Sequence, residues 1–495
     1  MLVVAAAAAG GLANALAFPG AGWWPLAFVG TPLLLAAMTV TRFRVAVAAS
    51  AVGGAVFWGT HVFWLTVYLG PAPWLALAGL ETMFFVVGAA ASWAVWRVLD
   101  RSGSAMRTYV FVPVAVAAVW AAREWVTGMW PYGGFGWGKL AYAQSESPFA
   151  DLAGWTGITG MSFLLALVGA VTVQVIRQRP PLPVRILGPA ALLVALALVP
   201  AFPLPTTGSL RVGAVQGNSE AGLLAVNQPG RILDDHLLAA APLLQEDLDL
   251  LVLPENAADL NPLERADAAA ALDELSRRTS APVVVGTITE TGDDMFNSAL
   301  VWEAGTGASG QYDKKHPVPF AEYIPDRDFW YPLAPGLFSL IPRDFALGER
   351  SNVLELDGVL AGVAICYDIV DDALIRDMIA GGAQLIVAPT NNADFGRTDQ
   401  SAQQLAIARL RAIETGRSLV NVSTVGVSAM IGPDGRAIDR LAPFAPGAMV
   451  NDVPLATATT PAILLGPLVD ALLVITGAVL AAGATFRLWR GRARG

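Results

Sequence analysis

The sequence predicts a protein of two parts: a polytopic α-helical membrane domain with eight spans, and an α/β domain outside the membrane. Three observations lead to this fold class. The chain of 495 residues is 55% hydrophobic and only 14% charged, and its mean hydropathy of +0.54 is well above that of an ordinary soluble protein. Long uncharged stretches alternate with short loops that carry Arg. A central segment has instead the alternation of strands and amphipathic helices that is typical of a layered α/β domain.

The uncharged stretches are long enough to cross a bilayer, which requires about 20 apolar residues. Residues 1–41 contain no charged side chain, and the Phe-Pro-Gly-Ala-Gly turn signal at 18–22 divides them into two spans. Buried core helices are the alternative for any single stretch, but eight stretches together indicate a membrane domain. The remaining spans are expected at about 45–69, 74–98, 108–128, 157–176, 185–203 and 462–486.

Basic loops predict the orientation, because Lys and Arg are retained on the cytoplasmic side of a membrane. The loops after spans two, four and six and the C-terminal tail carry Arg, whereas the loops at 19–23 and 70–73 carry no charge. We therefore expect a multi-pass protein of the plasma (inner) membrane, with both termini cytoplasmic and the segment between spans seven and eight on the outer face. The basic residues are Arg42, Arg44, Arg97, Arg101, Arg107, Arg177, Arg179, Arg185, Arg487, Arg490, Arg492 and Arg494.

The segment 205–460 differs from the rest in charge and in pattern. It holds 34 of the 40 acidic residues but only 17 of the 31 basic ones. We expect a membrane domain at 1–204 with seven transmembrane helices, an extracytoplasmic catalytic domain at 205–460, and an eighth transmembrane helix with a basic tail at 461–495. In the central domain, strands are expected at 210–216, 249–254, 283–289, 298–303, 359–366, 384–389 and 418–423, and helices near 229–245, 262–278, 371–380 and 399–415.

Composition also excludes several classes of partner. An acidic domain without a Lys/Arg-rich patch argues against nucleic acid, because phosphate binding depends on clustered cations. No His/Cys cluster has the spacing of metal ligands, so we expect no metal and no cofactor. A single cysteine leaves an exported domain without an internal disulfide. We expect the protein to be a monomer.

That cysteine, Cys366, is the candidate nucleophile. It ends an apolar strand just before a helix that begins near Asp371, and a helix N-terminus can stabilise a thiolate. A lone strand cysteine is more often a small buried hydrophobe, but two other strand ends favour chemistry. Glu255 ends one strand, where a carboxylate can accept the thiol proton. Lys314 follows another, where an ammonium can stabilise a developing oxyanion.

A papain-like Cys/His pair is the competing arrangement. The chain has three histidines. His61 lies in an expected span and His236 in an expected helix, while His316 is two residues from Lys314. We expect His316 to brace its loop rather than to act as a base.

The membrane part has candidates of its own. The loop at 129–153 is rich in aromatic residues and Gly, which fits either an aromatic belt at the headgroup level or a re-entrant segment. Glu81, Arg123 and Glu124 lie within or beside spans, where charge is expensive. They are functional candidates, with a structural pair inside the helix bundle as the alternative.

The order of the polar motifs resembles the nitrilase superfamily, whose fold is an αββα sandwich and whose triad is Glu-Lys-Cys. Strand-ending Glu255 is followed by Tyr-x-Lys-x-His at 312–316 and by Cys-Tyr at 366–367. The run KKHPVPFAEYIP at 314–325 resembles more particularly the apolipoprotein N-acyltransferase family. Further matches to that family are Phe135-Gly136-Trp137, Leu140 to Gln144, Gly157 to Phe163 and Arg409 to Arg417.

The resemblance implies a role for each residue of the triad. Cys366 would be the nucleophile, Glu255 the general base and Lys314 the oxyanion stabiliser, beside the backbone N–H of Tyr367. Residues of the same motifs would bind substrate or support the triad: Glu322, Tyr367, Asp368, Phe320, Tyr323 and Trp137.

The resemblance also implies an activity. In that family the thiolate takes an acyl chain from a phospholipid as a thioester and passes it to the α-amine of the N-terminal diacylglyceryl cysteine of a lipoprotein. The expected partners are a phospholipid donor, a lipoprotein acceptor and membrane lipid. One alternative is a membrane-anchored amidase or an acyltransferase with another acceptor. Another is a non-catalytic membrane scaffold for a polyprenol-phosphate mannosyl synthase.

Three motifs depart from the family pattern. Asp368 stands where the family has Glu after Cys-Tyr, and Asp394 stands where it has Trp. The family's Trp shortly after the first strand of the catalytic domain has no counterpart at 216–224. These departures concern the handling of lipid rather than the triad.

Overall fold

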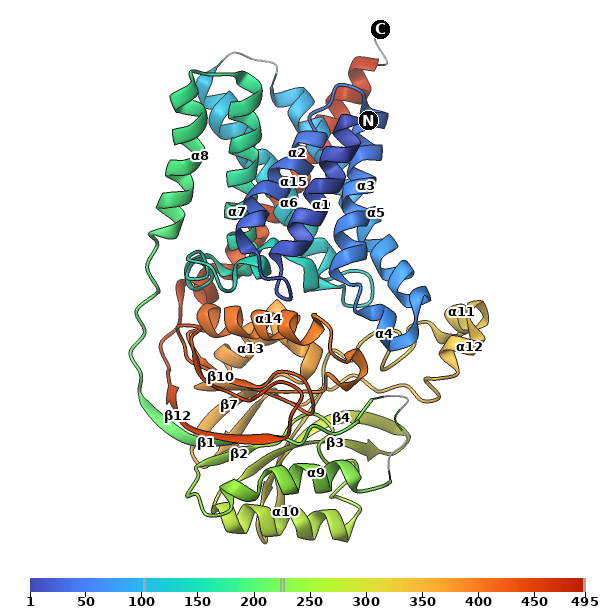
Figure 1. Ribbon diagram of the computed structural model, residues 1–495, viewed down its shortest axis with the longest axis vertical. Helices are drawn as coiled ribbons and strands as arrows, with labels where there is room; N and C mark the ends of the chain where they lie inside the picture. Colours follow the sequence, from blue (N-terminus) through green and yellow to red (C-terminus); the bar gives the residue numbers. More distant parts are fainter. Residues whose placement is uncertain (101–103, 223–224, 226–227, 493–495) are drawn as a thin grey trace. The chain divides into compact units, whose positions relative to one another are not determined.

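The computed structural model describes residues 1–100, 104–222, 225 and 228–492, and the chain divides into two compact units. Unit 1 comprises Met1–Phe202 and Pro461–Gly495, and unit 2 is Pro203–Thr460. Figure 1 shows that unit 1 is helical and that unit 2 contains the strands. Two of the Arg residues used to predict the orientation, Arg101 and Arg494, lie outside the described residues, as do positions 223 and 224 of the run that lacks the family Trp.

Unit 1 is built of apolar helices, as the sequence predicts. Within the described ranges, five helical segments are long and apolar enough to cross a membrane, and three further apolar helices are shorter. The long segments are α3 (Phe43–His61), α5 (Pro71–Leu99), residues 107–127 with α6 (Val112–Thr127), α7 (Leu152–Gln178) and α15 (Pro461–Arg492). The shorter helices are α1 (Leu2–Ala17), α2 (Ala27–Ala37) and α8 (Leu182–Ala197), and a single short turn forms α4 (Leu65–Leu69).

The expected span at 45–69 is two helices rather than one. Helix α3 ends at His61. The backbone then changes to the tighter three-residue hydrogen bond, in which the Phe63 N–H donates to the Thr60 carbonyl at 3.2 Å.

Close packing between helices relies on small residues: a Cβ on Gly11 of α1 would lie 2.1 Å from the carbonyl oxygen of Gly53 in α3. Small residues at such contacts are typical of helices that pack within membranes.

Unit 2 contains two six-stranded sheets within the residues that the structure describes. The first has the strand order β12-β1-β2-β3-β4-β5, and the second has the order β11-β10-β9-β8-β7-β6. Strands of the first sheet are β1 (Gly208–Gln216), β2 (Leu250–Val252), β3 (Val283–Thr291), β4 (Asp294–Glu303), β5 (Gly307–Asp313) and β12 (Gly447–Leu455). Strands of the second are β6 (Val353–Leu356), β7 (Val359–Val363), β8 (Leu385–Thr390), β9 (Ser418–Ser423), β10 (Ala429–Ile431) and β11 (Ala437–Arg440).

Each sheet has a parallel centre and antiparallel edges. Strands β1, β2 and β3 run parallel, as do β7, β8 and β9. Hairpins add β4 and β5 to the first sheet, and the β3–β4 turn places Gly292 at φ +63°, a conformation that favours glycine. Strand β12 returns from the end of the unit to pair antiparallel with β1 along its whole length. The carboxyl ends of parallel strands meet at one edge of a sheet, where sites of α/β folds form.

Helices cover the outer faces of the two sheets, which gives the αββα order of a nitrilase-like fold (Figure 1). Helices α9 (Arg231–Ala239) and α10 (Ala266–Thr279) pack on the first sheet; α10 buries Ala268, Leu272 and Leu275, spaced along one face. Helices α13 (Asp372–Ala380) and α14 (Gln400–Thr415) lie on the second sheet, and two short helices, α11 (Arg327–Trp330) and α12 (Pro335–Phe338), lie in the connection after β5. The nitrilase-like fold is confirmed.

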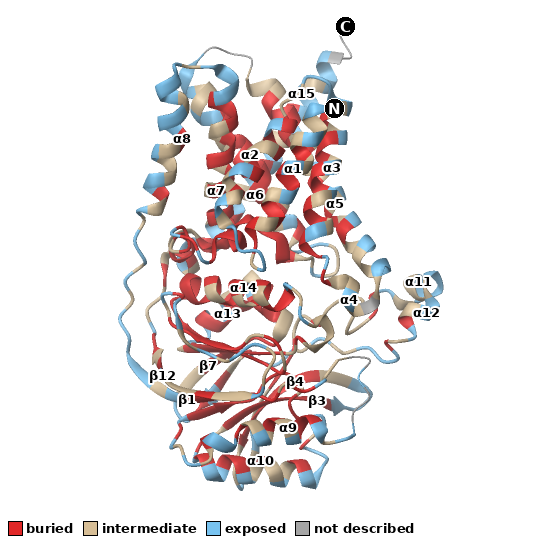
Figure 2. Cartoon of the chain, in the orientation of Figure 1, coloured by how far each residue is buried: buried red, intermediate tan, exposed pale blue. Residues whose placement is uncertain are grey.

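The main core lies between the sheets. One cluster of buried residues joins side chains from both sheets, among them Val252 of β2 and Val363 of β7. Figure 2 shows the buried strands at the centre of unit 2. Packing between the sheets therefore fixes the ends of β2 and β7 relative to each other.

Candidate active site

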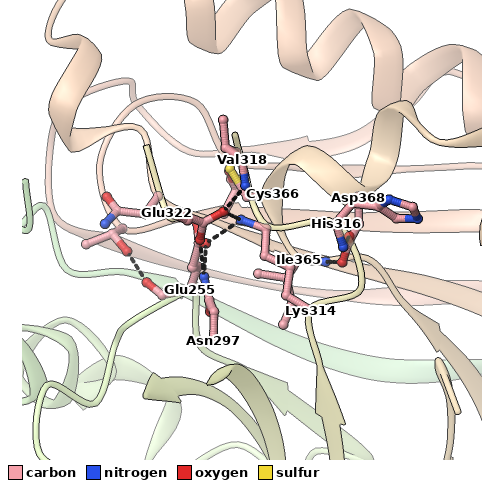
Figure 3. Close-up of polar contacts among 12 residues, drawn as sticks. Glu255, Asn297, Lys314, His316, Val318, Glu322, Ile365, Cys366 and Asp368 are labelled. Atoms are coloured by element: carbon pink, nitrogen blue, oxygen red, sulfur yellow. Dashed lines mark hydrogen bonds and ion pairs between the residues drawn. The ribbon is translucent and has the colours of Figure 1, made fainter. Parts of the chain in front are cut away.

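Three strand ends carry the predicted triad. Glu255 follows β2, Lys314 directly follows β5, and Cys366 follows β7 of the other sheet. Figure 3 shows the side chains of Glu255, Lys314 and Glu322 grouped together, with Cys366 beside them. The structure thus brings together in unit 2 the three residues of the predicted triad and Glu322.

The Lys314 ammonium binds two carboxylates in the protein interior. Its Nζ lies 2.8 Å from Oε2 of Glu322 and 3.3 Å from Oε1 of Glu255. The Lys314 side chain is only 1% exposed. The backbone holds the cation in place, because the Lys314 N–H donates to the Asn297 carbonyl at 2.8 Å. A buried ion pair of this kind depends on further hydrogen bonds to satisfy its remaining polar atoms.

Asn297 of β4 supplies such bonds and was not found from the sequence. Its Nδ2 donates to Oε1 of Glu255 at 2.7 Å and to Oε1 of Glu322 at 2.9 Å. Oε2 of Glu322 also accepts from the Val318 N–H at 2.6 Å. One amide therefore bridges the two carboxylates, and on Glu255 it shares Oε1 with the ammonium. No sequence signal marks an uncharged side chain within a strand as part of a site.

The electrostatics of this group favour a proton acceptor at Glu255. Burial raises the pKa of Glu255; the Lys314 ammonium opposes this shift, and the Glu322 carboxylate adds to it. Burial alone would lower the pKa of Lys314, but the carboxylates of Glu322 and Glu255 outweigh it and hold the pKa well above its usual value. Lys314 therefore stays charged, while Glu255 is a stronger base than an exposed glutamate.

Cys366 lies at a sharp corner between strand and helix. Its φ is +51°, in the left-handed region that non-glycine residues rarely adopt. A turn of 3₁₀-helix, Cys366–Val370, separates it from α13, whose first N–H groups are capped by Asp371. The expected helix is present, but its N-terminus is not at the sulfur.

The thiol is protonated at neutral pH. Burial raises the pKa of Cys366 to about 12; the Glu255 carboxylate adds to the shift, while Lys314 and a hydrogen bond from Thr390 act against it. The sequence-based expectation of a thiolate stabilised by a helix is thus not met, because the sulfur is buried beside two carboxylates. A general base is needed to remove the proton.

Two further polar side chains reach the sulfur. Gln404 of α14 donates from Nε2 to Sγ of Cys366 at 3.7 Å and to Oγ1 of Thr390 at 2.8 Å. Both residues are almost fully buried. Neither residue could be predicted from the sequence, because amides and hydroxyls on helices and strands are common in solvated positions.

Asp368 holds the loop of the nucleophile. Its carboxylate accepts from the Tyr312 hydroxyl at 2.9 Å, from the Ile365 N–H at 3.0 Å and from the His316 N–H at 3.1 Å. Burial raises the pKa of Asp368 to about 6, against the opposing charge of Lys314. The shorter carboxylate in place of the family's Glu is therefore fully hydrogen-bonded.

The imidazole of His316 pairs with Asp371 at 3.2 Å, so this side chain braces the loop.

Arg411 explains part of the Arg409 to Arg417 motif. Its guanidinium is fully buried and donates to the carbonyls of Ile369 and Val370, at 2.9 and 2.7 Å. It also pairs with Asp372 at 2.7 Å and Glu414 at 2.6 Å. Helix α14 is thereby fastened to the turn that carries Cys366.

The remaining expected site residues are Phe320, Tyr323, Tyr367 and Trp137. Phe320, at φ +64°, packs with Trp330 and Phe338 in a small apolar cluster after β5. The Tyr323 carbonyl accepts from the Phe320 N–H at 2.7 Å. Tyr367 is half-buried next to the nucleophile. Trp137 belongs to unit 1, where it is buried and its ring contacts Trp64.

The charged residues of unit 1 include a structural pair. Arg123 lies 3.1 Å from Glu124, and its guanidinium stacks over the rings of Phe85 and Trp120. Glu124 also accepts from Trp120 Nε1 at 2.6 Å. Glu81 is buried beside them and lines the same small cavity.

Comparisons with known proteins cover both units. The family described as apolipoprotein N-acyltransferase N-terminal domain matches residues 10–171, and carbon-nitrogen hydrolase matches residues 211–461. The crystal structure of an amidase from Nesterenkonia sp. is 20% identical, with a TM-score of 0.38 over 52% of this chain and 95% of the amidase.

Two relatives match nearly the full length. A protein named apolipoprotein N-acyltransferase from Mycolicibacterium smegmatis is 33% identical over 96% of this chain and 84% of its own. One of the same name from Azotobacter vinelandii is 32% identical over 88% of this chain and 86% of its own. On the strength of these relatives and the two family matches, the chain belongs to the apolipoprotein N-acyltransferase family.

Proposed function

We propose that this chain transfers an acyl chain from a phospholipid, through a thioester on Cys366, to the α-amine of the N-terminal diacylglyceryl cysteine of a lipoprotein. The observation that carries the chemistry is the buried group of Glu255, Lys314 and Glu322 beside a protonated thiol. A nucleophile, a base and a fixed cation are the parts that acyl transfer through a covalent intermediate requires.

The first half-reaction forms the thioester. Glu255 accepts the thiol proton as Sγ of Cys366 attacks the ester carbonyl carbon of the phospholipid. The S–C bond forms, and the Lys314 ammonium, with the backbone N–H of Tyr367, stabilises the oxyanion. Collapse of the tetrahedral intermediate breaks the C–O bond to glycerol. Glu255 then returns the proton to the departing alkoxide, which leaves as a lysophospholipid.

The second half-reaction transfers the chain to nitrogen. The α-amine must attack in its neutral form, and α-amines have pKa values of about 7.7–8.0. The amine attacks the thioester carbonyl, and Glu255 takes a proton from its nitrogen. The C–S bond breaks, the amide forms, and the sulfur recovers its proton from Glu255. Glu322 and Asn297 hold Glu255 in place through both steps.

The membrane arrangement is part of the proposal. Residues 1–204 and 461–495 would contribute eight spans to the plasma membrane, with the catalytic domain at 205–460 on the outer face and both termini cytoplasmic. The Arg-bearing loops support this orientation. Both substrates are anchored in lipid, so an enzyme in the same membrane meets them by lateral diffusion. One chain supplies the whole triad, which supports a monomer as the active form.

The test is a product assay with purified full-length protein in detergent. It is given a phospholipid and a diacylated lipopeptide with a free N-terminal cysteine amine, and Cys366→Ala is the matched control. We expect N-acylated lipopeptide with the wild type and none with the variant. Free fatty acid without acylated peptide would indicate the amidase instead. Absence of both products from a folded wild type would overturn the proposed transfer and would favour the scaffold.

A further inference from the structure

A neutral hydrogen-bond network surrounds the sulfur on the side of the second sheet. It consists of side chains from β8, α14, the segment between them and the end of β9, and it carries no formal charge. Its members are all buried to 97% or more: Thr390, Asn392, Gln400, Gln404 and Ser423. A buried network of this kind is stable only when each polar group has a partner, so its hydrogen bonds fix the direction of each donor.

The network fixes which end of the Gln404 amide faces the sulfur. Oε1 of Gln404 accepts from Asn392 Nδ2 at 2.6 Å and from Gln400 Nε2 at 3.3 Å. Oδ1 of Asn392 lies 2.9 Å from the Ser423 hydroxyl, whose single hydrogen is also directed to the Val425 carbonyl at 2.6 Å. With its oxygen facing two donors, Gln404 presents its NH₂ to Cys366 and Thr390.

The two hydrogens of that NH₂ have separate partners. One is donated to Oγ1 of Thr390 at 2.8 Å and the other to Sγ of Cys366 at 3.7 Å. Oγ1 of Thr390 accepts from Gln404, and the Thr390 hydroxyl also forms a hydrogen bond with the sulfur that lowers the pKa of Cys366. Sγ therefore faces two neutral donors.

We infer that Gln404 and Thr390 form a donor pair that stabilises the negative charge on the Cys366 sulfur as it attacks the donor ester and as it leaves the thioester. The inference rests on the proposed function and names two further catalytic residues for it. In both half-reactions Glu255 carries the proton, so the sulfur is most negative while its proton is on Glu255 and the S–C bond is forming or breaking. Donors on sulfur lower the energy of that state and leave the protonated thiol almost unaffected.

Neutral donors suit this position better than a second cation. Lys314 is already engaged by Glu255 and Glu322. A further cation beside the sulfur would favour the ionised form of the resting thiol. An amide and a hydroxyl add stabilisation for the thiolate without fixing the resting thiol in its ionised form.

The test measures the sulfur directly, without either lipid substrate. Full-length protein in detergent is treated with iodoacetamide at pH 8, and the rate of Cys366 alkylation is followed by intact mass. We expect Gln404→Met, which keeps the size of the side chain and removes the donor, to slow alkylation about tenfold to a hundredfold. The same variant should slow both half-reactions by similar factors while the KM for phospholipid is unchanged.

Gln400→Met is the matched control. It lies one turn away on α14 in the same network, and the Asn392 bond still orients Gln404 in this variant. We expect an alkylation rate within about twofold of the wild type. An equal loss in both variants, or no loss in folded Gln404→Met, would overturn the inference.

A second pair of variants decides the question if Gln404→Met does not fold. Thr390→Val removes the hydroxyl at constant shape and should slow alkylation, whereas Thr390→Ser should restore the rate. Equal rates for the two variants would contradict a donor role. Because iodoacetamide needs no acyl donor, a failed acyl-transfer assay with normal alkylation differences would count against the proposed function alone.

Discussion

Replacing Lys314 by methionine removes the ammonium that holds two buried carboxylates together. The change keeps most of the side-chain volume and deletes contacts of 2.8 Å to Glu322 and 3.3 Å to Glu255. Loss of one partner of a buried ion pair costs about 3–5 kcal/mol, because the other charge stays buried without compensation. Asn297 still donates to both carboxylates, which limits the loss but does not neutralise either charge.

The cost should depend on pH in a definite direction. Without the ammonium, the pKa of Glu255 in the folded variant, which burial already raises, rises further above the unfolded value of about 4.3. Between these values the folded state binds more protons than the unfolded state, so the free energy of unfolding falls as pH rises through that window. The variant should therefore be closest to the wild type near pH 5 and furthest from it near pH 8.

Thermal unfolding of the full-length protein in detergent, followed by tryptophan fluorescence, measures this effect. For a domain of this size, about 3–5 kcal/mol corresponds to a fall in Tm of about 5–20 °C. Lys315→Met is the control, since no ion pair of the Lys315 ammonium occurs in the described part of the chain. A Lys314→Met protein that melts within about 2 °C of the wild type at both pH values would refute the reasoning.

Three further outcomes follow from the structure. Asn297→Asp adds a carboxyl beside Glu255 and Glu322, so the pKa of Glu255 rises further and the acid limb of the pH–rate profile moves to higher pH; an unmoved limb would contradict the bridging role. Arg411→Met removes the donors to the turn after Cys366 and the ion pairs with Asp372 and Glu414, which should cost about 3 kcal/mol or more and slow thioester formation; an unchanged melting temperature would contradict this. A reporter fused after Gly208 should be active outside the membrane and one after Gly495 inside it, and the reverse pattern would overturn the orientation.

The sequence was most informative at the ends of expected strands, where a charged or reactive side chain follows. Glu255 and Cys366 each follow a hydrophobic run, whereas Lys314 follows the short polar strand that ends in Gln311-Tyr312-Asp313. A charged side chain at the end of a buried strand is too costly to bury without a partner. These positions could be found without a structure for that reason. The fold class followed from the same alternation of strands and helices.

The neutral residues of the site could not be found in this way. Asn297 lies within β4 and Gln404 within α14, and nothing in their neighbourhood distinguishes them from solvated amides. Their importance depends on contacts with residues far away in the chain, 42 positions for Asn297 with Glu255 and 38 for Gln404 with Cys366. Pairings of that range are fixed by tertiary packing alone.

Local geometry accounts for the other differences. The positive φ of Cys366 and the turn of 3₁₀-helix that follows it carry no signal in Cys-Tyr-Asp-Ile-Val. The helix expected to begin near Asp371 begins at Asp372. Strands β6, β10, β11 and β12 are absent from the sequence-based expectation, because the first three are short and β12 mixes polar and apolar residues on a half-exposed edge. Hydropathy likewise indicated one span where α3 and α4 are separate helices.

The most direct test of the central claim is intact mass spectrometry of the purified protein after incubation with phospholipid. We predict a mass gain of one fatty-acyl group that maps to Cys366, is released by hydroxylamine, is absent from Cys366→Ala, and disappears when a diacylated lipopeptide is added, with the chain recovered on the peptide amine. An N-acylated peptide formed without any adduct on Cys366, or an adduct that the peptide cannot discharge, would contradict the thioester as the intermediate.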